Sequence, residues 1–581
     1  MSEQAIPQAA DLIHEAFADW RDRFGAITTI ARRHFEGGDW QAMQRDSARR
    51  LDLYGEAVGE AIALLTPVLR ERLEERARWG GMRDAFAARI RDRGDAGLAE
   101  TFFNSITRRL FRTIGVEPRV EFVGPPEPGA GPAAGAGVTI TFRREGEDAA
   151  SLEHLVRSLL RHYAFAAGWD DFDGDARRIA GLLEADPAAR RLEAIDMARP
   201  VFFRGKGAYL VGRARTPDGP LPFLLALVNP DGRVVVDALL LTEDEVSIVF
   251  SFARSYFFAE MERPRDLVEF LAAIMPRKPI AELYNAVGCD KHGKTMLYRT
   301  LLHHLGTTDD RFVVAPGQRG MVMCVFALPG LDVVFKVIRD QFAAPKTVTH
   351  EEVREKYRLV FRHDRAGRLV DAQEFEHLTF HRARFDPDLL AMLLDLAPST
   401  VSVAGDRVVI RHLYTERRLT PLDVYLKSAP PEKARLAVLD YGQVLRDLAA
   451  TNIFPGDMLP KNFGVSRHGR LIFYDYDELC LLSDCRFRYL PAPSEDWEEG
   501  AAEPSFHVGE KDIFPEEFRA FLGFRGALLE EFLKAHGALL DARFWNEMQE
   551  RHRRGEVVDI YPYGTARRLR DSPEREDPPR L

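Results

Sequence analysis

The chain has 581 residues and a mass of 65.8 kDa, so a typical domain size of about 150 residues predicts two to four domains. Lys and Arg number 80 and Asp and Glu 90, which gives a formal net charge of −10 at pH 7. This mild acidity argues against a protein that binds nucleic acid or anionic membrane through its bulk charge, because such binding needs clustered Lys and Arg.

The cysteines are too few for a disulfide framework. The four of them, Cys289, Cys324, Cys480 and Cys485, form neither a CxxC pair nor a cluster with zinc-ligand spacing. The pattern therefore predicts a reducing, cytoplasmic location. The N-terminal segment lacks the basic and apolar regions of a signal peptide, and no apolar run approaches the roughly 18 residues needed to cross a bilayer.

The N-terminal half is predicted to be mainly helical. Residues 9–93 have apolar side chains at three-to-four spacing, which predicts two or three long helices. Two short strands are expected at 120–123 and 138–143. Residues 201–241 contain three apolar runs divided by Pro-Asp-Gly and Asn-Pro-Asp-Gly, which predicts an antiparallel meander. A helix should follow at Thr242, which has capping-box spacing to the glutamate three residues later.

Helical patterns continue to about Leu305, and near residues 307–310 the sequence becomes rich in strands. We place the domain boundary there, with a mainly helical domain containing a small antiparallel sheet in residues 1–310 and a second domain in residues 311–581. The second domain begins with strands, of which 333–338 is the clearest, and continues with helices, so the fold class is α+β. The charged, Pro-rich residues 567–581 are expected to form a disordered tail.

One segment of the second domain has the pattern of a kinase catalytic loop. Asp457 and Asn462 have D-x-x-x-x-N spacing, and Asp475 ends a strand that follows. Phosphoryl transfer needs one carboxylate to accept the proton of the attacking hydroxyl, while an amide oxygen and a second carboxylate hold Mg²⁺ against the phosphates. The alternative is that Asp457 and Asn462 only cap turns.

A glycine-containing turn precedes this segment at residues 315–321. Its backbone N–H groups would reach phosphate oxygens and Arg319 would add charge, although a plain hairpin turn also explains the glycines. Lys336 is the only cation in the apolar strand 333–338, where a charge is costly unless it is paired. Either it reaches the phosphates of a nucleotide or its head lies in solvent at a sheet edge.

Three acidic residues on the next helical stretch are candidate partners for this lysine. They are Glu351, Glu352 and Glu355.

A competing motif occurs at residues 288–295, which match the P-loop pattern G-x-x-x-x-G-K-[ST]. A P-loop follows a buried strand, whereas residues 280–287 have a helical composition. The context favours a helix that ends at Gly288 and a second helix that begins after it.

Several segments together resemble one protein family. The segments are Ala315-Pro-Gly-Gln-Arg-Gly-Met-Val-Met323, Val334-Phe-Lys-Val-Ile338, Asp371-Ala-Gln-Glu-Phe-Glu376, Ile410-Arg-His-Leu-Tyr414, residues 452–465 and Phe473-Tyr-Asp-Tyr-Asp-Glu478. Over essentially its whole length the chain resembles the bacterial isocitrate dehydrogenase kinase/phosphatase family. The resemblance implies a bifunctional enzyme that phosphorylates a serine of isocitrate dehydrogenase and also removes that phosphate. It thereby directs carbon between the tricarboxylic acid cycle and the glyoxylate bypass.

The resemblance also implies a bilobal, protein-kinase-like catalytic domain after an AMP-binding regulatory domain, with both reactions at one ATP/ADP site. The implied nucleotide-binding residues are Ala315, Pro316, Gly317, Gln318, Arg319, Gly320, Met321 and Lys336. Asp457 is the implied kinase base, Asn462 and Asp475 the Mg²⁺ ligands, and Asp371 the residue linked to phosphatase activity, with Asp477 as its helper. Asp475-Tyr-Asp477 replaces the usual D-F-G, which leaves open whether Asp475 or Asp477 is the main metal ligand.

The expected partners are isocitrate dehydrogenase, ATP and AMP, with no nucleic acid or membrane, and a homodimer is left open. Two alternatives remain: a kinase-like protein that acts on another substrate, and a pseudokinase module that binds nucleotide without catalysis. The presence of Lys336, Asp457, Asn462 and Asp475 favours catalysis.

Overall fold

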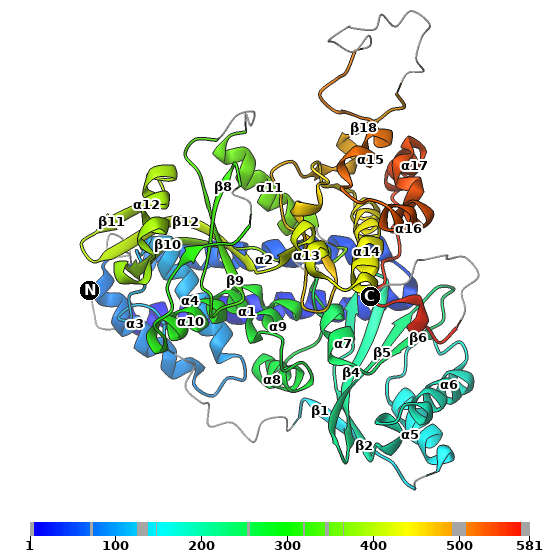
Figure 1. Ribbon diagram of the computed structural model, residues 1–581. Coiled ribbons are helices and arrows are strands. Elements are labelled where there is room, and N and C mark those ends of the chain that lie inside the picture. The colour runs from blue at the N-terminus through cyan, green and yellow to red at the C-terminus, as the bar shows by residue number, and fades with distance from the viewer. Residues whose placement is uncertain are drawn as a thin grey trace, which may run out of the picture. The chain divides into compact units, whose positions relative to one another are not determined.

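The computed structural model describes residues 5–69, 74–124, 137–146, 148–252, 256–317, 320–342, 348–363, 365–490 and 507–570. The chain divides into two compact units, and Figure 1 labels helices and strands of both. The first comprises Met1–Ala344, Ala372–Glu416 and Arg567–Ser572, and the second comprises Pro345–Asp371, Arg417–Ala566 and Pro573–Leu581. Helices and antiparallel sheets both occur, in agreement with the predicted α+β class. Within the described ranges, no helix is both long enough and apolar enough to cross a membrane.

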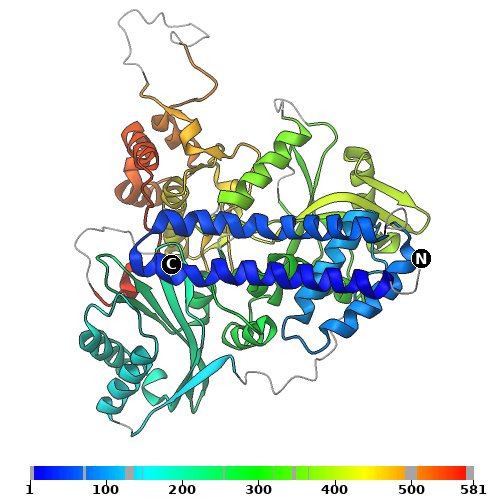
Figure 2. The same cartoon turned by 180° about the vertical axis from the view of Figure 1, so that it is seen from behind.

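Long helices open the first unit. They are α1 (Ala5–Gly37), α2 (Trp40–Leu69), α3 (Arg76–Ile90) and α4 (Ala96–Phe111). The buried side chains of α1 recur at Ile13, Phe17, Trp20 and Phe24, the spacing of a single helix face. This face packs on α2 and α3, and Figure 2 shows α1 and α2 side by side. The predicted long helices are therefore confirmed.

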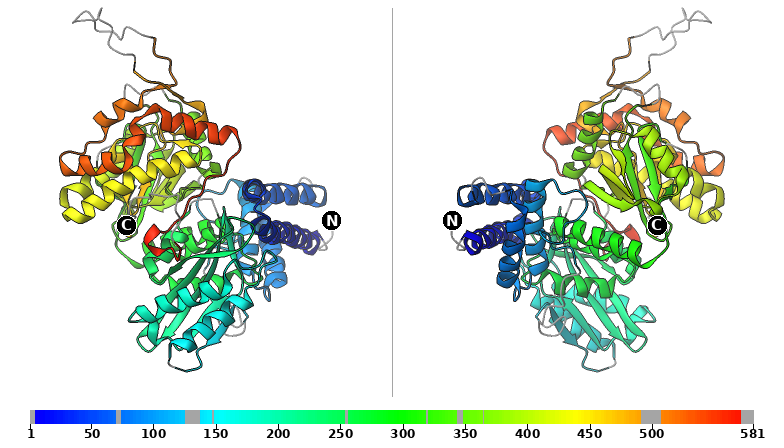
Figure 3. Two further views of the ribbon diagram at one scale, coloured as in Figure 1. Left: turned by 90° about the vertical axis from the view of Figure 1, so that its right-hand side faces the viewer. Right: turned by 90° about the vertical axis from the view of Figure 1, so that its left-hand side faces the viewer.

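An antiparallel sheet follows in the order β1-β2-β4-β5-β6, with β3 paired to β4. Its strands are β1 (Thr139–Arg143), β2 (Ala194–Ala198), β3 (Phe202–Arg204), β4 (Gly207–Thr216), β5 (Gly219–Val228) and β6 (Val235–Leu240). The helices α5 (Ala149–His162) and α6 (Phe172–Ala185) and the 3₁₀ turn η2 (Ala189–Arg191) accompany it, and α5 and α6 share its hydrophobic core (Figure 3). The predicted meander is confirmed, as is the helix after Thr242, where α7 (Glu243–Val249) begins with a complete capping box.

The strand predicted at 120–123 is wrong. These residues form a turn and irregular chain, because the side chain of Asn104 takes the place of a partner strand. Its Oδ1 accepts from Phe122 N and its Nδ2 donates to Phe122 O, both at 2.8 Å. A side chain thus satisfies backbone groups that would otherwise need a sheet.

Helices α8 (Pro264–Ile274), α9 (Ile280–Ala286) and α10 (Asp290–Thr307) lead to a second sheet. Gly288 lies between α9 and α10 with φ +86°, so the helix–glycine–helix interpretation is confirmed and the P-loop motif has no strand before it. The sheet order is β10-β12-β9-β8-β7, with β11 paired to β12. Its elements are β7 (Val313–Val314), β8 (Met323–Ala327), β9 (Val333–Ile338), β10 (Gln373–His381), β11 (Val401–Ala404), β12 (Arg407–Arg417), η3 (Arg382–Arg384) and α12 (Pro387–Leu396).

The second unit is mainly helical around small sheets. Its helices are α11 (His350–His363), α13 (Leu422–Ser428), α14 (Pro431–Ala450), α15 (Phe518–Phe521), α16 (Ala527–His536) and α17 (Ala542–Arg553). Its strands are β13 (Thr420–Pro421), β14 (Ile453–Phe454), β15 (Phe463–Val465), β16 (Leu471–Phe473), β17 (Cys480–Leu481), β18 (Arg486–Phe487) and β19 (Asp512–Ile513). Short 3₁₀ turns are η4 (Pro460–Asn462), η5 (Leu482–Asp484), η6 (Pro515–Glu517), η7 (Gly537–Leu540) and, before the last described residues, η8 (Thr565–Arg567).

The prediction of a disordered tail from residue 567 is wrong for residues 568–570. Arg568 pairs with Asp237 on β6 at 2.7 Å, and Arg570 pairs with the fully buried Asp175 on α6 at 2.8 Å. Leu569 N also donates to Asp237 O at 2.8 Å. These contacts anchor residues 568–570 to the first unit, and residues 571–581 lie outside the described residues.

A buried arginine holds the core of the second unit together. Arg368 is 1% exposed and donates to Asp440 at 2.7 Å and Asp447 at 2.8 Å, both on α14, and to the carbonyl of Leu471 at 3.0 Å. Phe473 N donates to the carbonyl of Arg368 at 2.8 Å. Burial opposes the charged form, but the two carboxylates outweigh it and raise the pKa of Arg368 above its ordinary value. The chain at 368 is thus fixed to both α14 and β16.

We predict that Arg368→Met strongly destabilises the protein, because it leaves two buried carboxylates without their cation. The expected loss is about 3–5 kcal/mol of the free energy of unfolding, measured by urea denaturation. Arg435→Met, which removes a surface arginine from α14, is the matched control and should leave the unfolding midpoint unchanged. Equal midpoints for the two variants would contradict the assigned role of Arg368.

Candidate active site and a basic cavity

The predicted catalytic loop runs from β14 to β15. Gly456 has φ +74°, and a Cβ there would lie 2.5 Å from the carbonyl oxygen of Glu478, so glycine is required. Asp457 follows it, and its Oδ1 accepts from Leu459 N at 3.0 Å. Asn462 is 2% exposed and its Nδ2 donates to the carbonyl of Asp457 at 3.3 Å. The loop therefore brings together the predicted base and the predicted amide ligand.

The acidic segment after β16 lies beside this loop. β15 and β16 pair as an antiparallel hairpin, and Tyr474 N donates to the carbonyl of Asn462 at 3.1 Å. Asp475 and Asp477 follow directly, and both are half-buried. Asp475 therefore comes directly after a residue that is hydrogen-bonded to Asn462, and Asp477 lies two residues further along the chain.

Asp371 lies at the end of a separate chain segment that is hydrogen-bonded alongside β16. Val370 N donates to Phe473 O at 3.2 Å, and the hydroxyl of the buried Tyr476 donates to Val370 O at 2.8 Å. Tyr476 stands between the two acidic residues of the segment, so these bonds fix Asp371 alongside it. Hydrogen bonds within the second unit therefore connect the segment that ends at Asp371, the loop with Asp457 and Asn462, and the segment with Asp475 and Asp477.

The donor set fits a magnesium ion. The hydrogen bond of Asn462 orients its Nδ2 toward Asp457, so its Oδ1 faces the other way, and Asp475 adds carboxylate oxygens. Across the described ranges, no group of three or more His, Cys, Asp or Glu side chains is placed to hold a metal alone. Mg²⁺ is commonly held by one or two carboxylates together with water and phosphate oxygens.

Lys336, predicted to bind nucleotide, belongs to the first unit. It is 7% exposed on β9, and its Nζ lies 2.7 Å from Oε2 of Glu416 on the neighbouring strand β12. Glu416 is 3% exposed, so this is a buried ion pair rather than a solvated lysine at a sheet edge. The pairing holds the ammonium group at a fixed place on the sheet.

Sequence reasoning looked for the partner of Lys336 on the next helix and missed Glu416. Glu351 pairs with Arg358 at 2.6 Å, and Glu352 accepts from the backbone N of Thr349 at 2.6 Å as part of a helix cap. Glu355, the third candidate, lies one turn further along α11. The residue that pairs with Lys336 comes from a strand that is adjacent in the sheet and distant in the sequence.

The glycine-containing turn lies between β7 and β8. Ala315 N donates to Val325 O at 3.1 Å, which closes the strand pair at the base of the turn. Pro316, Gly317, Gly320 and Met321 are exposed, and Gly317 has φ +120°. Gln318 and Arg319 lie outside the described residues.

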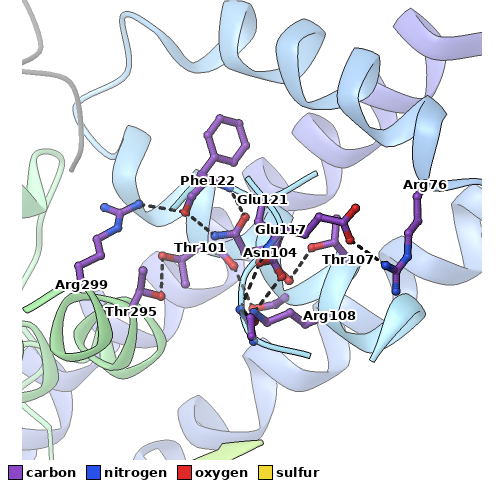
Figure 4. Close-up of polar contacts among 12 residues, drawn as sticks. Arg76, Thr101, Asn104, Thr107, Arg108, Glu117, Glu121, Phe122, Thr295 and Arg299 are labelled. Carbon is purple, nitrogen blue, oxygen red and sulfur yellow. Dashed lines mark hydrogen bonds and ion pairs between the residues drawn. The ribbon is translucent and has the colours of Figure 1, made fainter. Parts of the chain in front are cut away.

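A cavity of about 440 Å³ lies elsewhere in the first unit. Its walls come from α4 and the chain after it, from α10, and from β10. Figure 4 shows one wall, where Asn104 and Arg299 both contact the carbonyl of Phe122 and Arg108 pairs with Glu121. The lining includes the cationic side chains Arg108, Arg109, Arg112, Lys291, Lys294 and Arg299, together with Tyr298 and the acidic Glu121, Glu374 and Glu376.

The cavity has an excess of positive charge. Glu374 accepts from His412 at 2.6 Å and Glu121 is paired with Arg108 at 3.0 Å, so these two carboxylates are engaged locally. Lys294 lies over the ring of Phe375 at 4.9 Å, and burial, reinforced by nearby cations, lowers the pKa of Lys294 to about 8. A half-buried lysine whose pKa is lowered in this way favours an anion in this space.

Backbone strain is concentrated at these two places. Three non-glycine residues in the described ranges have positive φ: Arg112 (45°), His377 (53°) and Asn452 (63°). Arg112 and His377 line the cavity, and Asn452 opens the chain segment that leads to Asp457. Such strain collects at functional sites, where the surrounding structure enforces it.

Sequence reasoning missed the cavity. The last turn of α4 carries Arg108 and Arg109, and Arg112 follows it. The P-loop-like segment places Lys291 and Lys294 on α10. Each is unremarkable alone, because surface helices commonly carry such charges. Only the packing of α4 against α10 brings the two sets together.

Two family models together match almost the whole chain. The regulatory domain of isocitrate dehydrogenase kinase/phosphatase (AceK) matches residues 10–309, and the kinase domain of the same family matches residues 310–565. An isocitrate dehydrogenase kinase/phosphatase from Anaeromyxobacter sp. (strain Fw109-5) is 50% identical over 569 residues, which covers 96% of this chain and 97% of the relative. Another from Anaeromyxobacter dehalogenans (strain 2CP-C) is 48% identical over 577 residues, 97% of each chain. The chain therefore belongs to the isocitrate dehydrogenase kinase/phosphatase family.

Proposed function

We propose that this protein phosphorylates a serine of isocitrate dehydrogenase with ATP and hydrolyses the same phosphoserine, in the cytoplasm, so that it sets the flux into the glyoxylate bypass. Relatives named isocitrate dehydrogenase kinase/phosphatase match this chain over nearly their full length. The observation that supports both activities best is the clustering of Asp457 and Asn462 with three further carboxylates in the second unit.

The proposed catalytic domain is bilobal and begins near residue 311. Its strand-rich lobe is the sheet of β7–β12 with Lys336, and its helical lobe is the second unit with Asp457. The start of the kinase-domain match at residue 310 and the end of α10 at Thr307 support this boundary.

In the kinase reaction, Asp457 accepts the proton of the attacking serine hydroxyl. Leu459 N occupies its Oδ1, which leaves Oδ2 to face the substrate. The residues 315–321 and Lys336 hold the phosphates of ATP, and the ion pair with Glu416 keeps Lys336 in place. Asn462 and Asp475 would hold Mg²⁺, which when bound neutralises developing charge on the phosphates.

In the phosphatase reaction, Asp371 orients a water molecule toward the phosphorus of phosphoserine, with Asp477 as a second carboxylate. A protein kinase site needs only one base and the metal ligands, so an additional carboxylate on a segment bonded to β16 and to Tyr476 supports a hydrolytic role.

We predict that Asp371→Ala and Asp457→Ala separate the two activities. Phosphatase activity of Asp371→Ala should fall by about 10²-fold or more while its kinase activity stays near wild type, because only hydrolysis uses the ordered water. Asp457→Ala should lose kinase activity by a similar factor. The assay is transfer and release of labelled phosphate with purified isocitrate dehydrogenase, ATP and Mg²⁺.

Glu530→Ala, which removes an exposed carboxylate from α16 of the same unit, is the matched control. Equal losses of both activities in Asp371→Ala would contradict the division of labour. Absence of any label transfer by the wild type, with normal nucleotide binding, would support a pseudokinase, and transfer to other proteins alone would support a different substrate.

We also propose that the basic cavity of the first unit binds AMP as the allosteric effector. A volume of about 440 Å³ accommodates a nucleotide, the excess cations suit its phosphate, and Tyr298 offers an aromatic face for its base. The phosphate group would lie near Lys294, whose half-buried side chain gains a counter-ion on binding.

We predict that AMP affinity depends on the charge of Lys294. The dissociation constant should rise as the pH passes 8, because Lys294 then loses its proton. Lys294→Met should weaken binding by about 10- to 100-fold, the value of one charge-assisted hydrogen bond, and abolish this pH dependence. Isothermal titration calorimetry measures both, with the exposed Lys534→Met as control. Unchanged affinity in Lys294→Met would place AMP elsewhere.

A further inference from the structure

Two cysteine sulfurs lie in contact next to the catalytic loop. Cys480 is on β17 and Cys485 follows the turn η5, and their Sγ atoms are 3.5 Å apart. Both residues are half-buried and both are free thiols. The other two cysteines, Cys289 and Cys324, are buried at separate places in the first unit.

The surroundings make the two thiols chemically unequal. The contact with Cys485 lowers the pKa of the Cys480 thiol and outweighs burial, which raises it, and the positive charges of Lys356 and Lys511 lower it further. The same contact raises the pKa of Cys485, which therefore keeps its proton. Burial raises the pKa of Cys289 to about 11, so that thiol has little thiolate. Cys480 thus has the character of an attacking thiolate, and Cys485 that of a resolving thiol.

The turn between the two cysteines is hydrogen-bonded to the start of the catalytic loop. Leu482 N donates to the carbonyl of Asn452, and Ser483 N donates to Oδ1 of the same residue, both at 2.9 Å. Cys480 also lies opposite Phe454 in the β14–β17 pair. Asn452 and Phe454 begin the segment that ends at Asp457, so any shift of this turn acts on the loop.

We propose that Cys480 and Cys485 form an intrachain disulfide when they meet a peroxide, and that this bond alters the catalytic loop. The Cys480 thiolate attacks one oxygen of hydrogen peroxide, the O–O bond breaks, and the product is a sulfenic acid and, after protonation, water. The sulfur of Cys485 then attacks the sulfur of Cys480 and displaces hydroxide, which takes the proton of Cys485 and leaves as a second water. Two thiols are oxidised by two electrons, one peroxide is reduced to two waters, and a dithiol reductant reverses the step.

The bond requires a local movement. The sulfurs must approach from 3.5 Å to about 2.0 Å, which draws the turn η5 toward β17. Because Leu482 and Ser483 are bonded to Asn452, a residue already held at φ +63°, this movement disturbs the entry to the loop. Oxidation should therefore lower the activities that use Asp457. This effect on activity rests on the proposed function, whereas formation of the disulfide does not.

The first test is mass spectrometry of the full-length protein after treatment with hydrogen peroxide. Both cysteines lie between Arg470 and Arg486 with no Lys or Arg between them, so one tryptic peptide, 471–486, carries the pair. We expect this peptide to become lighter by two hydrogens and to lose both sites of thiol alkylation, with recovery on dithiothreitol treatment. Cys289 and Cys324 should remain alkylatable after denaturation and act as internal controls. A peptide that stays reduced, or that is oxidised no faster than Cys289 and Cys324, overturns the proposal.

The second test uses variants. Cys485→Ser should stop at the sulfenic acid on Cys480, which dimedone traps, and Cys480→Ser should not react, while Cys324→Ser should behave as wild type. Kinase turnover of the wild type should fall on oxidation and recover with dithiothreitol. Kinase turnover of Cys485→Ser should not change on peroxide treatment. A disulfide that forms without changing turnover would overturn the coupling to the loop. A disulfide that forms in a protein inactive toward isocitrate dehydrogenase would instead count against the proposed function.

Discussion

The buried pairing of Arg368 with Asp440 and Asp447 is the interaction on which the candidate catalytic cluster depends. A guanidinium group has donors on a rigid fork, and here they reach two carboxylates and one carbonyl at once. The result connects three segments that are far apart in the sequence: the chain before Asp371, the helix α14 and the strand β16. The positions of Asp371 and Asp475 relative to each other follow from this junction, because each lies only a few residues beyond it.

Local sequence signals predicted most helices and strands. Contacts between segments that are distant in the sequence determine which of their residues come together. The capping box at Thr242 and the turn residues of the meander act within a few positions, so the sequence alone revealed them. The strand expected at 120–123 failed because the side chain of Asn104 satisfies that backbone, which no local pattern indicates.

The candidate site shows the same limit. The spacing of Asp457 and Asn462 is local and was predictable, and the structure brings the two together. Glu416 was not predictable as the partner of Lys336, because strand order, rather than the sequence, makes β9 and β12 neighbours. The cationic side chains of the cavity come from α4, from the residue after it and from α10. They line one space only because those helices pack together.

Within the first unit, one sheet connects the cavity with Lys336, the residue proposed to bind nucleotide. β10 contributes Glu374 to the cavity wall and pairs with β12, which carries Glu416. Leu301 of α10, the helix that bears Lys291 and Lys294, is part of the hydrophobic core of the same sheet. A ligand that repositions β10 or α10 therefore acts on the strands that hold Lys336, without any long-range mechanism beyond packing.

The left-handed residues Arg112, His377 and Asn452 bear on how far this protein can be stabilised. Glycine would relieve the backbone strain at each position, although it would also give the unfolded chain more freedom. Two of these side chains line the cavity, and Asn452 receives the bond from Ser483. A glycine that stabilises the fold at one of these positions would remove a side chain from the cavity or from the contact with Ser483. The trade-off between stability and activity is therefore concentrated at these three positions.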